Sequence, residues 1–170
     1  MSMYARLLGI AAVVSGLGLS EALPAGDVWK GAWKFESDRQ DRPFLTYSDN
    51  GGKTVFRIGC GTHFEMYVVY PAAPKQDGRQ SASITIANGK TQMDFAGFID
   101  AGTEYDPPHA TMFDQADLGY PDLDEDKWRA LENRVLDLLT GQPLTISAEG
   151  KSYVLPPVNV RLRARFQKIC

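Results

Sequence analysis

Residues 83–93 read SITIANGKTQM, and this stretch decides the class of fold. Apolar and polar residues alternate on both sides of Asn88-Gly89. An Asn-Gly step readily adopts the positive φ angles of a two-residue hairpin turn, so the stretch predicts two antiparallel strands joined at this step. A second hairpin is expected where Asn50-Gly51 lies between strands at 44–47 and 53–58. The chain therefore builds its sheet from neighbouring antiparallel strands.

The rest of the chain adds strands of the same kind to these hairpins. Further strands are expected at 28–36, 64–70, 144–147, 152–155 and 158–169. The last of these alternates Val158, Val160 and Leu162 with polar residues, which indicates a strand with one buried face and one solvated face. Residues 100–121 contain a Pro-Pro step and scattered acidic residues, and they predict a long loop.

One helix is expected, over 123–140. Asp122 is a suitable N-cap and Glu125 completes a capping-box pattern, while the Gly and Pro that follow the segment end the helix. Its apolar residues recur at helical spacing: Trp128, Leu131, Val135, Leu138 and Leu139. Such a face packs on a core or binds a partner. Together these elements predict a mainly β protein with one α-helix, folded as an antiparallel β-sandwich or a half-open barrel.

The N-terminus has the pattern of an export signal. Arg6 precedes an uncharged apolar stretch at 7–19 that is too short to span a bilayer but suits the core of a signal peptide. We therefore interpret residues 1–22 as a signal peptide and residues 23–170 as a single β-rich domain. The alternative is an N-terminal core helix, which the glycines of this stretch disfavour. The sequence predicts a periplasmic or secreted protein with no transmembrane segment in its mature form.

The chain contains two cysteines, Cys60 and Cys170. In an oxidising compartment two cysteines pair more often than they stay free, and one pairing exists here. A disulfide between them would close a loop of roughly 100 residues, which the chain-entropy model values at about 4–5 kcal/mol. The alternative is a catalytic or metal-binding pair of Cys60 and His63, although no second Cys-x-x-His element completes a tetrahedral site.

The layout of the chain resembles that of small exported proteobacterial β-proteins. The shared features are a tryptophan-led first strand, Arg57 and Cys60 before an aromatic strand, Pro143-Leu144-Thr145 after a helix, and a terminal Phe166-x-x-x-Cys170. The invasion-associated locus B group and the TagO-like accessory proteins of type VI secretion have this layout. The resemblance implies a periplasmic or secreted accessory protein, and it carries over no catalytic residues.

Positive charge is concentrated near the C-terminus of an otherwise acidic chain. The chain has 21 acidic against 18 basic residues, a balance that does not suggest a nucleic-acid binder. In a strand, Arg161, Arg163 and Arg165 would leave one face as a basic ladder. This ladder is a candidate site for an anionic envelope component or another envelope protein. The alternative is that it faces solvent or pairs with acids such as Asp94 or Glu65.

The loop around His109 is the candidate for catalysis or metal binding. Asp106, Asp114 and Asp117 lie close to His109 in the sequence, and imidazole with carboxylates is a ligand set that Zn²⁺ or Mn²⁺ accepts. The spacing matches no established motif, so solvated loop acids are the alternative. The sequence therefore favours an exported envelope binding or accessory protein without catalytic activity or cofactor. The alternative function is a small exported hydrolase, metal-assisted or not, that uses the His109 loop.

Overall fold

The protein is mainly β, as the sequence predicts. The computed structural model describes residues 27–39, 41–60, 64–101, 112–116, 125–139 and 141–169. In chain order the elements are β1 (Asp27–Val28), β2 (Gly31–Ser37), β3 (Pro43–Asp49), β4 (Thr54–Cys60), β5 (Phe64–Val69), β6 (Gly78–Ala87), β7 (Gln92–Ala101), β8 (Met112–Ala116), α1 (Glu125–Leu138), β9 (Leu144–Ala148), β10 (Lys151–Leu155) and α2 (Val160–Ile169).

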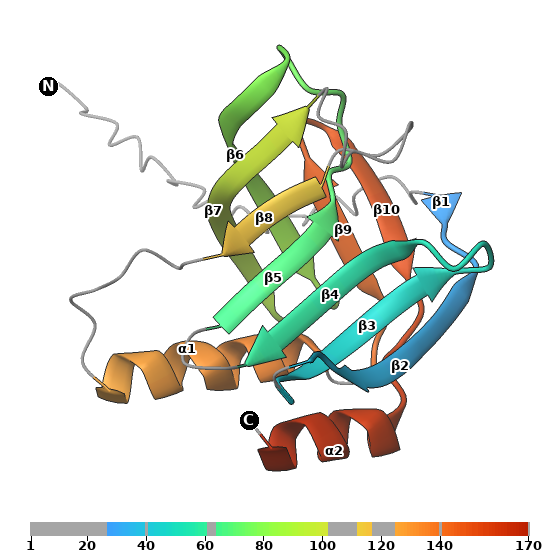
Figure 1. The fold of residues 1–170 in the computed structure, drawn as a ribbon, viewed down its shortest axis with the longest axis vertical. Coiled ribbons are helices and arrows are strands. Elements are labelled where there is room, and N and C mark those ends of the chain that lie inside the picture. The colour runs from blue at the N-terminus through green and yellow to red at the C-terminus, as the bar shows by residue number, and fades with distance from the viewer. Residues whose placement is uncertain are drawn as a thin grey trace, which may run out of the picture.

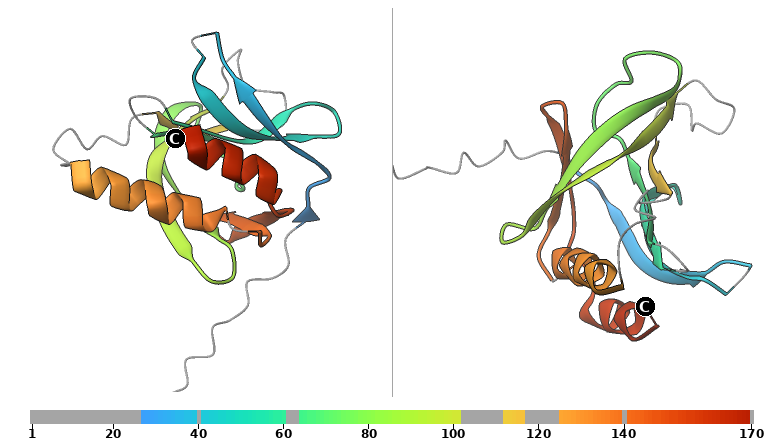
Figure 2. Two further views of the ribbon diagram at one scale, coloured as in Figure 1. Left: turned by 90° about the horizontal axis from the view of Figure 1, so that it is seen from below. Right: turned by 90° about the vertical axis from the view of Figure 1, so that its left-hand side faces the viewer.

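The strands form one continuous sheet that folds back on itself (Figure 1). Their hydrogen-bonded order is β1-β10-β9-β6-β7-β8-β5-β4-β3-β2, and only the β1–β10 pair of the described strands is parallel. The long β6–β7 hairpin joins the two halves, because β6 pairs with β9 and β7 pairs with β8. The halves face each other across the core, with both helices at one end (Figure 2). This arrangement agrees with the predicted antiparallel sandwich or half-open barrel.

The two edge strands of this order are consecutive in the chain. The amide of Trp29 donates to the carbonyl of Val154 on β10 at 3.1 Å, while the carbonyl of Lys30 accepts from the amide of Asn50 at 3.1 Å. Neighbouring residues thus pair with opposite ends of the sheet. Gly31 is needed at this point because a Cβ there would overlap the carbonyl oxygen of Ser48. The expected strand at 28–36 is therefore two strands that close the sheet.

Two tryptophans fill the space beside this closure. The Trp29 ring contacts the Tyr153 ring edge-to-face at a centroid distance of 5.8 Å, and the Trp29 carbonyl accepts a hydrogen bond from the Tyr47 hydroxyl at 2.8 Å. Trp33 packs edge-to-face on Tyr47 and Phe56, and its indole N–H donates to the carbonyl of Pro156 at 2.8 Å. Tyr47 and Trp33 thus combine apolar packing with a satisfied side-chain polar group.

The predicted hairpin is confirmed, although its turn closes between Asn88 and Thr91 and has a positive φ at Gly89 but not at Asn88. Asn88 also contacts the end of α1. Gly89 has a φ of 80°, as the turn requires. The Asn88 carboxamide oxygen accepts from the amides of the two residues that complete the turn, at 3.0 and 2.8 Å. Its amide group donates to the carbonyls of Asp137 and Leu138, at 2.8 and 3.1 Å, at the C-terminal end of α1. The same side chain therefore forms the turn and satisfies helix-end carbonyls.

The expectation for the C-terminal segment was wrong. Residues 160–169, predicted to be part of a strand, form α2, so the part of the chain that the structure describes has two helices instead of one. Phe166 is fully buried in the core and Leu162 packs against the core from the same side of the helix. These two residues are four positions apart, a spacing that a helix presents on one face.

The other predicted strands and the predicted helix are present with small changes, while the predicted signal peptide at 1–22 lies outside the described residues. The predicted hairpin strands near 44–58 and the strands at 64–70, 144–147 and 152–155 are present as β3, β4, β5, β9 and β10. The predicted helix is α1, which begins at Glu125 and ends at Leu138. The predicted loop at 100–121 contains β8, and its other residues after Ala101 lie outside the described ones. No helix among the described residues has the length and apolar character needed to cross a bilayer.

We predict that Asn88→Asp destabilises the protein by about 2–3 kcal/mol. The substitution keeps the acceptor of the turn, but it removes two hydrogen bonds to α1 and places a nearly buried negative charge at the negative end of a helix dipole. Chemical denaturation measures the effect. The control is Asn50→Asp in an exposed turn, which should change stability by less than about 0.5 kcal/mol. An equal effect of the two substitutions would contradict the assigned role of Asn88.

Candidate functional site

Helix α2 starts at a side-chain cap. The Asn159 carboxamide oxygen accepts from the amide of Arg161 at 2.8 Å, and the Asn159 carbonyl accepts from the amide of Arg163 at 3.0 Å. Asn at an N-cap stabilises a helix start, and the Pro-Pro step before it prevents a helix from starting earlier. The cap sets the rotation of α2, because Phe166 must then point into the core.

Because the C-terminal segment is a helix, its cations are grouped differently from the grouping that a strand predicts. Arg161, Arg165 and Lys168 follow a spacing of four and then three residues, which places them on one helix face. All three are exposed, and we call them the basic face. Arg163 lies off this face and is half-buried. The predicted ladder of Arg161, Arg163 and Arg165 is therefore wrong, because it required a strand.

The charge of the basic face is not balanced by any ion pair among the described residues. Among the described residues no acidic side chain forms an ion pair with any cation of α2. The suggested partners are engaged elsewhere, since Glu65 pairs with Arg42 and Asp94 accepts a hydrogen bond from Thr85. The Arg165 guanidinium lies 4.2 Å from the centroid of the Phe35 ring, a cation–π contact that orients it without neutralising it.

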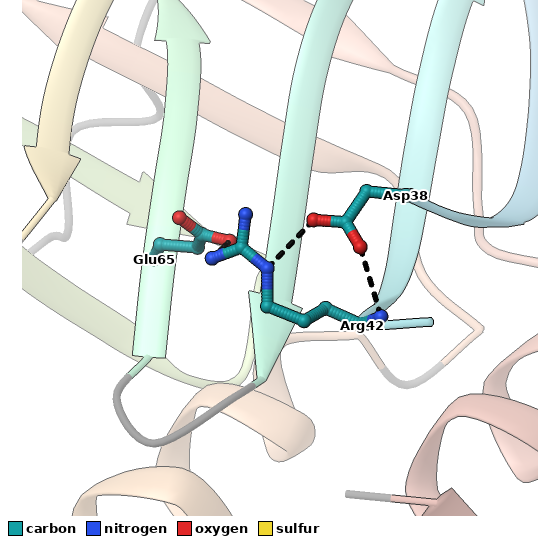
Figure 3. A network of polar contacts seen from close by, with 3 residues as sticks. All are labelled: Asp38, Arg42 and Glu65. Carbon is teal, nitrogen blue, oxygen red and sulfur yellow. Dashed lines mark hydrogen bonds and ion pairs between the residues drawn. The ribbon is translucent and has the colours of Figure 1, made fainter. Parts of the chain in front are cut away.

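A second polar cluster lies on the outer face of the sheet, where β3, β4 and β5 meet (Figure 3). Arg42 Nε lies 2.6 Å from Asp38 Oδ2, and Arg42 Nη1 lies 3.2 Å from Glu65 Oε1. The hydrogen bond to Asp38 raises the pKa of Arg42, and the charge of Glu65 raises it further. Arg42 thus ties the β2–β3 turn to the start of β5.

A stacked pair adjoins this cluster. The Arg57 guanidinium carbon lies 3.6 Å from the centroid of the Phe44 ring. The ring in turn lies on Gly59, where a Cβ would overlap it. Gly59 pairs with Phe44 across β3 and β4, so the absence of a side chain lets the ring lie flat on the sheet. This stack fixes the position of one arginine on the outer face.

The loop predicted for catalysis or metal binding lies largely outside the described residues. Asp106, His109 and Asp117 are not among them, and nor is His63. The backbone of Asp114 belongs to β8, opposite Tyr67 of β5. No group of three metal-binding side chains gathers within the described ranges. The metal and hydrolase hypotheses therefore stay predictions.

A shallow depression of about 230 Å³ lies at the β9–β10 turn, lined by residues such as Thr85, Ser147 and Lys151. Pockets that bind small molecules usually enclose about 300–1,000 Å³. Beside it, Lys75 pairs with Glu149 at 2.8 Å, and this hydrogen bond lowers the pKa of Glu149. Because the depression is small and open, we do not take it as the functional site.

Comparison of the chain with models of known families, with curated proteins and with solved structures finds no match. The resemblance to small exported β-proteins thus rests on the sequence layout alone.

The outer-face cluster and Lys168 were not predicted from the sequence. Lys168 lay outside the expected ladder because a strand has a period of two residues. The contacts of Phe44 and Arg57 depend on the register between β3 and β4, which a turn-based prediction leaves open. No local pattern in the sequence pairs these two residues.

We predict a disulfide between Cys60 and Cys170. Cys60 ends β4, and the C-terminal end of α2 lies beside that end of the strand in the views of Figures 1 and 2. The side chains of both cysteines lie outside the described residues. Mass spectrometry of non-reduced protein should find the two joined, and reduction should lower the melting temperature by several degrees. Two free thiols in protein freshly isolated from an oxidising compartment would contradict the pairing.

Proposed function

We propose that the protein is an exported, non-enzymatic binding protein of the bacterial envelope, which contacts an anionic envelope component through α2. The observation that carries this proposal is the basic face of Arg161, Arg165 and Lys168 on an acidic protein, a face with which no described acidic side chain pairs. Export and envelope location rest on the signal-like sequence at 1–22.

The position of these cations on the helix supports a binding role. Lys168 lies in the last turn of α2, where a cation stabilises a helix. Arg161 lies in the first turn, where a cation is unfavourable and where α2 has no acidic residue to offset it. A charge placed against the helix dipole has no stabilising role in the fold, so a role in binding accounts for it better.

The surroundings of the basic face suit an anionic lipid surface. Exposed Ile169 follows Lys168 at the end of the helix and borders the basic face. A cationic helix face beside exposed apolar groups is typical of helices that lie at a lipid–water interface. The opposite side of α2 is held by buried Phe166, so the helix presents this face without leaving the core.

We predict that the triple variant R161Q/R165Q/K168Q loses about a hundredfold in affinity for phosphatidylglycerol vesicles at low salt. Each cation near an anionic membrane contributes about 1 kcal/mol, so three contribute about two orders of magnitude in affinity. Co-sedimentation with vesicles measures the loss, and parental binding should weaken as ionic strength rises. The melting temperature should change by no more than about 2 °C because the charges are exposed.

The matched control is the variant K53Q/K90Q/K151Q, which removes three exposed charges that lie in or next to hairpin turns. It should bind vesicles like the parent. An equal loss in the control would assign binding to net charge instead of α2. Absence of vesicle binding by the parent at low salt, together with no binding to a soluble polyanion, would contradict the proposed function.

A further inference from the structure

Two buried polar atoms on the outer face of the sheet have no hydrogen-bond partner among the described residues. They are Thr46 Oγ1 on β3 and Arg57 Nε on β4. Thr46 as a whole is 2% exposed, so water does not reach its hydroxyl freely. Burying an unsatisfied polar group costs free energy, and native proteins leave few such groups. The presence of two unsatisfied atoms on neighbouring strands therefore requires an explanation.

The two atoms belong to residues that face each other directly. Thr46 and Arg57 are partners in the register of β3 and β4, so their side chains leave the same face of the sheet about 5 Å apart at Cβ. Their neighbours along β3, Leu45 and Tyr47, point the other way into the core. One small acceptor on the outer face can therefore satisfy both atoms at once.

The Arg57 side chain is held in place, and no acidic residue described in the structure forms an ion pair with it. Its guanidinium stacks on Phe44, which itself rests on Gly59. The acid nearest in register, Glu65, is engaged by Arg42 at 3.2 Å. No described acidic side chain forms an ion pair with Arg57. The site thus offers a positioned N–H donor, a positive charge and a hydroxyl.

We infer that Thr46 and Arg57 form a binding subsite for one oxyanion, a carboxylate or phosphate group. The oxyanion accepts from Arg57 Nε–H and from the Thr46 hydroxyl, which supplies the partner that each atom lacks. An oxyanion suits the site better than a water molecule, because it also balances the guanidinium charge and matches the planar fork of donors. The subsite lies on the opposite face of the sheet from the Arg165–Phe35 contact of α2, and it does not depend on the function proposed for α2.

The test follows the Arg57 Nε–H resonance in ¹H–¹⁵N spectra of the full mature protein. The probes are inorganic phosphate and acetate, each added at constant ionic strength against sodium chloride. We expect a saturable shift of this resonance with at least one probe, and the probe that acts identifies the oxyanion as phosphate or carboxylate. No saturable shift with either anion would overturn the subsite and leave an internal water as the partner of both atoms.

Thr46→Val separates a ligand role from a structural one. The substitution keeps the shape of the side chain but removes the hydroxyl, and we expect anion affinity to fall by about tenfold or more. The melting temperature without anion should stay the same or rise, because an unsatisfied hydroxyl is replaced by a methyl group. The control is Thr85→Val, whose hydroxyl donates to Asp94 at 2.7 Å on another part of the sheet and which should leave anion binding unchanged. A lower melting temperature in Thr46→Val with unchanged anion affinity would overturn the inference.

Discussion

The closure of the sheet at Trp29–Lys30 is the constraint on which the rest of the structure depends. One peptide unit joins Trp29, whose amide pairs with β10, to Lys30, whose carbonyl pairs with Asn50 just after β3. The spacing between the two ends of the sheet is therefore fixed covalently. Gly31 allows the chains to approach, and Trp29 and Trp33 fill the space beside them. The interior that results is a packed core.

Both helices take their positions from this closed sheet. Asn88, in the turn of the hairpin that joins the two halves, fixes the end of α1, and Phe166 fixes the rotation of α2. With Phe166 buried, Arg161, Arg165 and Lys168 lie on an exposed face of α2. The exposure of the cations of the terminal helix is thus a consequence of core packing. The pairing of Thr46 with Arg57 on the outer face of β3 and β4 is an independent consequence of strand register.

Local signals in the sequence predicted most of the fold, whereas contacts between residues far apart in the sequence were not predicted. The Asn88-Gly89 hairpin was predictable because two residues determine its geometry. The C-terminal segment was misread because Val158, Val160 and Leu162 fit a period of two, although the Asn159 cap and the spacing from Leu162 to Phe166 indicated a helix. The pairing of Thr46 with Arg57 depends on the register of β3 and β4. The pairing of Trp29 with one end of the sheet and of Lys30 with the other depends on the fold of the whole chain. Neither arrangement has a sequence signature.

The β1–β10 pairing also bears on how the chain acquires its fold. It joins residues 27–28 to residues 153–154, so the sheet has a contact of very high sequence separation. A polypeptide synthesised from its N-terminus presents β1 as an unpaired strand until its partner β10 has been made. The contact that ties the two ends of the sheet together can therefore form only once nearly the whole sheet has been synthesised.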